Sequence, residues 1–302
     1  MRFFAFILLL FVVLNAEPIT PIPQSVEVDE QKVKLGKKLF FDTVLSADNT
    51  ISCASCHDLQ NGGDDGLKFS FGIRGQEGDI NSPTVYNAVY NFRQFWNGRA
   101  ENLSHQTWGP IENPVEMGNK FRELITTLNQ TSYKKEFSNI YSDGVTKNNI
   151  GNVIAEYEKT LITPNASFDK YLRGDKSAIS RMQKDGYELF KTKGCIACHH
   201  GVNVGGNLYN KFGVMREVKS KRLGRYEITK KEADKYYFKV PSLRNIALTA
   251  PYLHDGRYDK LEDVVKFMAR YQLGRTVSQE EVDKIVSFLH SLTGEMPSSA
   301  HR

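Results

Sequence analysis

The sequence has few of the features that would indicate a disulfide-stabilised, membrane-spanning or nucleic-acid-binding protein. It contains only four cysteines in 302 residues, and all of them lie in two short motifs, so none remains for disulfide bonds. Its long apolar run, residues 3–14, is too short to cross a bilayer as a helix. The formal net charge of +5 is mild and does not indicate a nucleic-acid partner.

The four cysteines form two C-x-x-C-H motifs, which is the attachment pattern of c-type haem. They are Cys53-Ala54-Ser55-Cys56-His57 and Cys195-Ile196-Ala197-Cys198-His199. Two thiols at this spacing reach the two vinyl groups of one haem, and the adjacent histidine presents a ring nitrogen to the iron. A four-thiolate zinc site built from both pairs is the alternative, but it leaves the trailing histidines unexplained. The sequence therefore predicts a dihaem cytochrome c.

The first residues have the pattern of a secretory signal peptide. Arg2 precedes the apolar run, and Asn15 and Ala16 follow it, so we expect residues 1–16 to be removed. Leu14 stands where the cleavage rule prefers a small residue, so an uncleaved anchor is the alternative. No cysteine follows the run, which excludes a lipoprotein anchor. Because c-type haem is attached outside the cytoplasm, we expect a periplasmic protein of a Gram-negative bacterium.

The chain repeats one arrangement in two halves. Gly36-Lys37-Lys38-Leu39-Phe40 and Gly186-Tyr187-Glu188-Leu189-Phe190 precede the two haem motifs, and each predicts a helix that packs its Leu-Phe pair on a core. Each half closes with another apolar-periodic helix, over residues 150–162 and 282–292. A first helix, a haem loop and a last helix that crosses the first form the cytochrome c plan. We expect a mainly α fold with two cytochrome c-like domains, residues 17–164 and 165–302, packed through an interface.

Two shorter segments carry weaker signals. Residues 17–25 contain three prolines and predict an extended lead-in. Residues 85–90 fit either a strand or a turn of helix, and both interpretations stay open.

The sequence contains different candidate sixth ligands for the two haem irons. An iron that reacts with a small molecule needs an open position, whereas an electron carrier usually has both axial positions filled. Met268 lies on a predicted helix that could pass over the second haem, although it could be core packing, and His254 is the reserve ligand. Between His57 and His105 there is no histidine or methionine, so a lysine such as Lys68 is the nearest substitute. One filled and one open iron indicate an enzyme.

Several segments of the chain resemble the bacterial dihaem cytochrome c peroxidases. The resemblance covers nearly all of the mature chain in the family's order. The segments that carry it are residues 81–88, 94–100, 106, 109–118, 194–199, 240–245, 248–252 and the predicted helix with Met268.

For the first haem, the resemblance implies the machinery of peroxide reduction. His57 corresponds to the proximal ligand of the peroxide-reacting haem, Glu116 to its distal acid–base residue, and Gln106 to a distal hydrogen-bonding partner. A carboxylate above an open iron can move a proton between the two peroxide oxygens, and a pocket that raises its pKa favours this near neutral pH. His105, beside Gln106, is better explained as a surface residue.

For the second haem, the resemblance implies electron entry. His199 and Met268 correspond to the axial pair of a high-potential haem that takes electrons from a reduced cytochrome c or a similar donor. Trp96 corresponds to the aromatic residue between the two haems.

The resemblance also implies a calcium ion at the domain interface and a homodimer. Asn81, Thr249 and Pro251 correspond to calcium-binding positions, the last two through backbone carbonyls. Calcium takes six to eight oxygen ligands, so these three positions need waters or further carbonyls to complete a site.

The loop before Asn81 departs from the family pattern. Many relatives have a histidine there that blocks the peroxidatic iron in the oxidised state, whereas this chain has Ile73. We therefore expect the oxidised N-terminal haem to be open already.

Two other functions remain as alternatives. A dihaem electron carrier would have both irons six-coordinate and no use for Glu116 or Gln106. A dihaem oxidant that acts on a protein, like the relative that matures the tryptophan-derived quinone of methylamine dehydrogenase, would carry an axial tyrosine where this chain offers Met268. The sequence thus favours an enzyme that reduces hydrogen peroxide to water.

Overall fold

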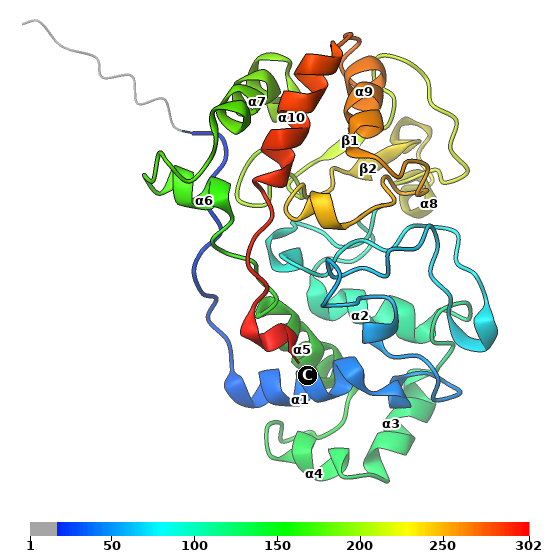
Figure 1. The fold of residues 1–302 in the computed structure, drawn as a ribbon. Helices are drawn as coiled ribbons and strands as arrows, with labels where there is room; N and C mark the ends of the chain where they lie inside the picture. Colours follow the sequence, from blue (N-terminus) through cyan, green and yellow to red (C-terminus); the bar gives the residue numbers. More distant parts are fainter. Residues whose placement is uncertain (1–16, 302) are drawn as a thin grey trace, which may run out of the picture.

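The computed structural model describes residues 17–301, and the predicted signal peptide, residues 1–16, lies outside this range. The described chain is mainly helical, with one two-stranded sheet, and forms two cytochrome c-type domains (Figure 1). The mainly α fold expected from the sequence is confirmed. Within residues 17–301, no helix is both long and apolar enough to cross a membrane.

The N-terminal half contains helices α1 to α5. Their bounds are α1 Glu30–Phe41, α2 Leu103–Glu112, α3 Phe121–Asn129, α4 Tyr133–Ser138 and α5 Lys147–Lys159. Short 3-10 helices lie between them: η1 Thr43–Leu45, η2 Cys53–Ser55, η3 Ile73–Gly75 and η4 Ala88–Tyr90. The segment over residues 85–90, left open from the sequence, therefore ends in a single 3-10 turn.

The C-terminal half contains helices α6 to α10 and the small sheet. The helices are α6 Ser167–Leu172, α7 Arg181–Thr192, α8 Tyr226–Thr229, α9 Leu261–Tyr271 and α10 Gln279–His290. Strands β1 Tyr209–Lys211 and β2 Tyr237–Lys239 pair antiparallel, with Tyr209 opposite Lys239. The 3-10 helices here are η5 Cys195–Ala197, η6 Glu232–Asp234, η7 Ile246–Leu248 and η8 Ser298–Ala300.

Each half is built on a close crossing of two helices at a glycine. A Cβ atom on Gly36 of α1 would lie 1.8 Å from the carbonyl oxygen of Val153 in α5. In the same way, a Cβ on Gly186 of α7 would lie 1.9 Å from the carbonyl oxygen of Lys284 in α10. Both glycines open the predicted Gly-x-x-Leu-Phe segments, so the repeated motif marks the place where a first helix meets a last helix without a side chain between them.

Local sequence signals also fix where these helices begin. In α7, the Ser180 side chain accepts from the Gln183 backbone N–H, and the Gln183 side chain accepts from the Ser180 backbone N–H. Ser278 and Glu281 form the same capping box at the start of α10. The apolar faces behind these caps form the core of the C-terminal half around Phe168, Tyr187, Phe190 and Phe288.

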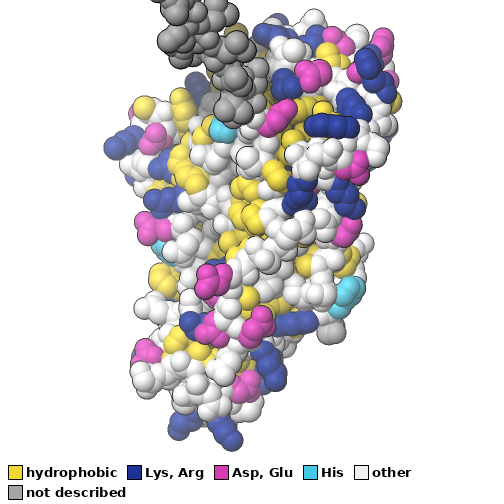
Figure 2. Space-filling model, turned by 90° about the vertical axis from the view of Figure 1, so that its left-hand side faces the viewer, with side chains coloured by type: hydrophobic (Ala, Val, Ile, Leu, Met, Phe, Trp, Pro, Cys, Tyr) yellow, Lys and Arg dark blue, Asp and Glu magenta, His cyan; other side chains and the backbone are white. Residues whose placement is uncertain are grey.

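The two chain ends are exchanged between the halves. At the N-terminal end, Ile19 is buried in the core of the C-terminal half, and the Tyr187 hydroxyl donates to the Glu17 carboxylate at 2.6 Å. At the other end, the segment after α10 returns to the N-terminal half, where Ala300 packs beside Phe40 and Tyr157. Figure 1 shows both segments running along the same side of the molecule, and Figure 2 shows a band of hydrophobic side chains between charged ones on that face. The extended lead-in is therefore part of the packed structure.

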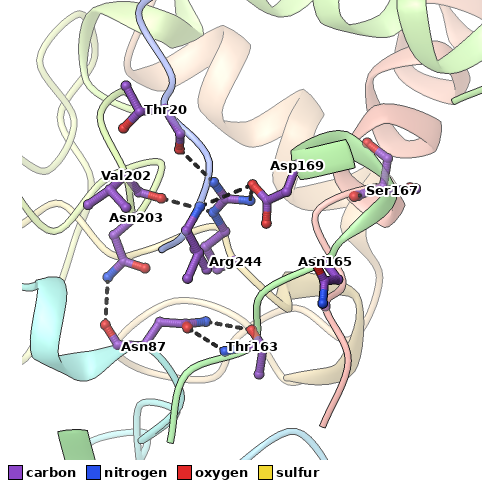
Figure 3. Close-up of polar contacts among 12 residues, drawn as sticks. Thr20, Asn87, Thr163, Asn165, Ser167, Asp169, Val202, Asn203 and Arg244 are labelled. Carbon is purple, nitrogen blue, oxygen red and sulfur yellow. Dashed lines mark hydrogen bonds and ion pairs between the residues drawn. The ribbon is translucent and has the colours of Figure 1, made fainter. Parts of the chain in front are cut away.

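A buried arginine joins three segments of the chain on this side (Figure 3). The Arg244 and Asp169 side chains are fully buried and form an ion pair with an N···O distance of 2.7 Å. Arg244 also donates from Nε to the Val202 carbonyl and from Nη2 to the Thr20 carbonyl, both at 3.0 Å. The guanidinium thus holds the N-terminal lead-in, α6 and the loop after the second haem motif together.

A second polar cluster in Figure 3 joins the two halves directly. Asn87 donates from Nδ2 to the Thr163 hydroxyl at 2.8 Å and accepts from the Thr163 backbone N–H at 2.9 Å. Asn245 donates to the same hydroxyl at 3.0 Å, and Asn203 donates to the Asn87 carbonyl at 3.2 Å. All four side chains are buried, so these hydrogen bonds fix the relative position of the halves.

Replacing Arg244 by methionine is expected to lower the free energy of unfolding by about 3–5 kcal/mol, because Asp169 would remain buried without its partner. Unfolding of the haem-loaded protein in guanidinium chloride measures this change. The double variant Arg244→Met/Asp169→Leu removes both charges and should recover most of the loss. The control Arg181→Met breaks an exposed ion pair with Asp185 and should cost less than about 1 kcal/mol. A comparable cost for both single variants would contradict the prediction.

Candidate haem sites and the cavity between the domains

The two C-x-x-C-H motifs adopt the same local structure. Each begins with a 3-10 turn, and the histidine backbone N–H donates to the carbonyl of the first cysteine at 3.1 Å, His57 to Cys53 and His199 to Cys195. All four thiols are partly buried and none is in a disulfide. The turn therefore places both cysteines and the histidine of each motif next to one another, as attachment of one haem requires.

Each motif histidine is oriented by a backbone carbonyl. His57 Nδ1 lies 3.2 Å from the Gly63 carbonyl, and His199 Nδ1 lies 3.3 Å from the Val204 carbonyl. Because a carbonyl only accepts, Nδ1 carries the proton in both rings and Nε2 keeps its lone pair for a metal. Burial lowers the pKa of His57, and it lowers the pKa of His199 to about 4, so both imidazoles are neutral at neutral pH.

The zinc alternative does not fit the arrangement of the cysteines. Within residues 17–301, no three His, Cys, Asp or Glu side chains come close enough together to hold a metal ion. The four cysteines of the described chain therefore do not form one shared four-thiolate site, and two separate haem sites are supported.

The second motif opens into a largely apolar cavity that reaches the domain interface. Cys195, His199 and Met268 line it from the C-terminal half, and Asn81 and Trp96 line it from the N-terminal half. An adjoining cavity is lined by Cys195, Cys198, His199 and Met268. A flat apolar ligand attached to the cysteines, with a histidine and a methionine available to its metal, fits this lining.

Met268 and His254 differ in their availability to a metal. Met268 is partly buried on α9 and lines both cavities. His254 is also buried at the adjoining cavity, but its Nε2 is paired with the Ser220 hydroxyl at 2.8 Å. Its ring stacks on Phe238 with a centroid distance of 4.4 Å. The imidazole is thus held by its own neighbours, and Met268 is the better candidate for the sixth ligand.

Trp96 joins the two halves at this cavity. Its indole N–H donates to the Asn81 carbonyl at 2.9 Å, and its own carbonyl accepts from the Lys239 backbone N–H at 2.7 Å. The Trp96 ring also lies edge-on to the ring of His254, with centroids 6.0 Å apart. The side chain predicted to lie between the haems is therefore fixed by contacts to both halves.

Glu116 lies within electrostatic range of Cys56 in the first haem motif. Burial is the main cause of the raised pKa of Cys56, and the negative charges of Asp65 and Glu116 raise it further. The Glu116 side chain is partly buried and accepts a hydrogen bond from Asn113 Nδ2 at 2.6 Å. Burial raises the pKa of Glu116, against the lowering effects of Asn113 and of the positive charge of Arg99. A carboxyl with a raised pKa beside the first motif is the arrangement expected of a proton-transfer residue.

The loop around Ile73 holds the backbone of Glu116. The Ile73 backbone N–H donates to the Glu116 carbonyl at 2.8 Å, and the Ile73 side chain is buried against Gly118. Gly72 approaches so closely that a Cβ atom would lie 1.9 Å from the Val115 carbonyl oxygen. At Ile73 the sequence predicts only the lack of a blocking histidine, not this supporting contact.

Gln106, His105 and Lys68 are not among the residues that line the two cavities. Gln106 is partly buried on α2, and its side chain has no hydrogen-bond partner within residues 17–301. His105 Nδ1 accepts from the Glu101 backbone N–H at 3.4 Å, in keeping with a surface role. Lys68 is exposed.

The three predicted calcium positions meet at one cavity. Asn81, Thr249 and Pro251 all line the large cavity between the halves. The Asn81 amide donates from Nδ2 to the Leu67 carbonyl at 3.0 Å, so its Oδ1 is not used in that contact.

Two buried titratable residues at the cavity were missed by the sequence analysis. Asp64 is 2% exposed, burial and neighbouring Asp65 raise its pKa to about 7, and its Oδ1 has no partner among the described residues. Lys239 is 7% exposed, and burial lowers its pKa to about 8. Asp64 follows the glycine pair Gly62-Gly63, and Lys239 ends strand β2. Neither position carries a local sequence signal of burial.

Comparison with known proteins gives a consistent result over both halves. A family model described as di-haem cytochrome c peroxidase matches residues 30–177, and a cytochrome c model matches residues 183–293. The chain is 46% identical to a cytochrome c551 peroxidase of Nitrosomonas europaea, covering 93% of this chain and 85% of the relative. For a cytochrome c551 peroxidase of Pseudomonas aeruginosa, the identity is 42%, over 92% and 84%.

A longer relative and two solved structures extend this comparison. The chain is 50% identical to a cytochrome c peroxidase of Escherichia coli, but spans only 61% of its length. A crystal structure of a MauG-like protein associated with microbial copper homeostasis matches with a TM-score of 0.79 at 23% identity, over 96% of this chain and 97% of that chain. The diheme peroxidase BthA from Burkholderia thailandensis matches with a TM-score of 0.76 at 20% identity, over 94% of both. These two likenesses show the fold.

Proposed function

The chain belongs to the dihaem cytochrome c peroxidase family, and from that premise we propose that it reduces hydrogen peroxide to water with electrons from a reduced cytochrome c or a similar donor. Membership of this family makes it an enzyme with two c-type haems, which removes the pure electron carrier as an alternative. The observation that carries the proposal is Glu116, a partly buried carboxyl with a raised pKa beside the first haem motif.

The two halves take different roles in this proposal. When bound, the haems store and transfer the electrons and provide the iron at which the peroxide O–O bond breaks. His57 is the protein ligand in the N-terminal half, and His199 with Met268 are the ligands in the C-terminal half. Cleavage consumes one peroxide, two electrons and two protons and yields two water molecules.

Glu116 is the proton-transfer residue of this proposal. Its carboxylate accepts the proton from one peroxide oxygen and delivers it to the other, which then leaves as water. Asn113 orients the carboxylate through Oε1, and Ile73 fixes the backbone behind it. Gln106, with no partner of its own within residues 17–301, is free to donate a hydrogen bond to the peroxide.

The C-terminal half receives the electrons, and Trp96 carries them towards the N-terminal half. Methionine–histidine ligation raises the reduction potential of a c-type haem, which suits the site of electron entry. Trp96 lines the cavity at His199 and is anchored to Asn81, so it bridges the two sites. The axial methionine distinguishes this site from that of the dihaem oxidant with an axial tyrosine.

We also propose a calcium ion at the interface, a periplasmic location and a homodimer. Asn81, Thr249 and Pro251 line one cavity. In this proposal Asn81 Oδ1 and the backbone carbonyls of Thr249 and Pro251 supply the hard oxygen ligands that calcium prefers. The periplasm is the compartment in which a Gram-negative cell attaches c-type haem. The homodimer rests on the family alone.

The variant Glu116→Gln is expected to lower the turnover of hydrogen peroxide by about 100-fold to 10,000-fold, because the amide cannot accept the proton. Steady-state oxidation of a reduced cytochrome c, with calcium and reductant supplied, measures this loss. The matched control is Glu112→Gln. It alters an exposed glutamate at the end of α2 that pairs with Lys147 of α5, and it should keep wild-type turnover. Equal rates for Glu116→Gln and wild type would remove Glu116 from this role, and a wild type without turnover would overturn the proposed function.

The pH dependence of turnover should show an acid limb above the pKa of an ordinary glutamate. Burial raises the pKa of Glu116, so the carboxylate is protonated, and its activity lost, at a higher pH than an exposed glutamate would be. The limb should disappear in Glu116→Gln. The haem absorption spectrum, recorded over the same pH range, separates this effect from loss of the histidine ligands. An unchanged limb in the variant would contradict the assignment.

The oxidised protein is expected to contain one low-spin and one high-spin or water-ligated haem without prior reduction. Ile73 replaces the blocking histidine and is packed against Gly118, and Lys68 is exposed, so neither is placed to close the N-terminal iron. Electron paramagnetic resonance of the oxidised protein distinguishes the two states. Low-spin signals alone, or activity that depends strictly on prior reduction, would show the expectation to be wrong.

A further inference from the structure

Lys239 is a buried lysine without a counter-ion among the described residues. It is the last residue of β2, it is only 7% exposed, and it lines both cavities at the second haem motif. Its ammonium group makes no hydrogen bond or ion pair within residues 17–301. A buried charge without a partner is strongly destabilising, so a lysine kept in such a place indicates an anion in the loaded protein.

The other charged groups at the cavities do not provide that anion. Lys193 pairs with Glu281 at 2.5 Å, and Arg275 donates to the Thr192 carbonyl at 3.1 Å, so both cations are already engaged. Asp64 also lines the large cavity, but among the described residues its carboxyl group forms no ion pair with Lys239. Among the described residues that line the cavities, Lys239 is therefore the cation whose charged group has no partner.

A haem has the complementary chemistry, because it is a large apolar ring with two propionates. The propionates stand on the edge of the ring opposite to the vinyl groups. Attachment at Cys195 and Cys198 therefore turns the propionate edge away from these cysteines and from their neighbour Lys193. The cavity extends from Cys195 to Trp96 at the interface, and the Lys239 backbone N–H is bonded to the Trp96 carbonyl at 2.7 Å.

We propose that the Lys239 ammonium binds a propionate of the C-terminal haem and raises the reduction potential of that haem. This inference rests on the proposed function, because it requires haem at the second motif. An oxidised haem carries one more positive charge than a reduced one, so a nearby ammonium disfavours the oxidised form. Pairing also cancels the negative charge of the propionate, which would otherwise favour the oxidised form. The effect is large because burial weakens solvent screening.

The same contact positions the electron path. Lys239 holds the propionate through its side chain and Trp96 through its backbone N–H. Trp96 and the propionate edge of the C-terminal haem are thereby both held by Lys239. Lys239 thus acts on both the potential and the geometry of the electron-entry site, without touching peroxide.

The test is a potentiometric titration of the haem-loaded protein, followed at the low-spin haem. Lys239→Met should lower the equilibrium constant for one-electron reduction of the C-terminal haem at least tenfold, a fall of about 59 mV. Lys239→Gln should show the same direction of change, and Lys239→Arg, which keeps the charge, should stay near wild type. The matched control Lys211→Met removes an exposed lysine from the neighbouring strand β1 and should shift the equilibrium constant less than twofold.

The propionate contact has its own spectroscopic readout. In resonance Raman spectra, the propionate bending mode should shift in Lys239→Met and Lys239→Gln but not in Lys211→Met. An unchanged potential and an unchanged mode in both Lys239 variants would overturn the inference. It would also be overturned if Lys239 were itself the iron ligand, shown by a methionine–iron charge-transfer band that is absent in the wild type and appears in Lys239→Met. A wild type that does not turn over peroxide but shows the predicted shifts would refute the proposed function and leave this inference intact.

Discussion

The hydrogen bond from each motif histidine to a backbone carbonyl is the contact on which the rest of the arrangement depends. It fixes the tautomer and the ring direction of His57 against Gly63 and of His199 against Val204, so both haem sites start from the same proximal geometry. Since the proximal sides are alike, any chemical difference between the sites comes from what the fold places on the opposite side. The duplicated motif thus provides two equal sites, and the less regular segments make them unequal.

Those segments differ in kind between the halves. In the C-terminal half, α9 places Met268, a side chain without a proton to exchange, at the cavity of His199. In the N-terminal half, the loop after α2 places Glu116 near the first motif, with Asn113 on its carboxylate and Ile73 on its backbone. In the proposed function, the methionine of one half suits storage of an electron, and the buried acid of the other half suits movement of a proton.

The sequence predicted the features that depend on local spacing and missed those that depend on distant contacts. Both Gly-x-x-Leu-Phe segments, both closing helices and both haem turns could be predicted, because period, capping and motif spacing are local properties. The exchange of the chain ends could not, because contacts such as Tyr187 with Glu17 join residues far apart in the chain. The burial of Lys239 was missed for the same reason: a lysine in a short strand is normally exposed. Roles that came from the family resemblance, such as that of Glu116, had no signal in the residue itself.

Electron transfer between the two sites requires a fixed separation, and the structure secures it with polar contacts rather than with apolar packing alone. Thr163 and Asn87 lock the linker to the N-terminal half, while Arg244 and Asp169 lock the lead-in to the C-terminal half. Hydrogen bonds of this kind are directional, so they define an orientation that an apolar interface would leave adjustable. Each chain end also crosses to the opposite half. Separating the halves would therefore remove Ile19 from the core of the C-terminal half and Ala300 from the core of the N-terminal half. The position of Trp96 at the cavity between the halves is therefore a property of the whole chain and not of one domain.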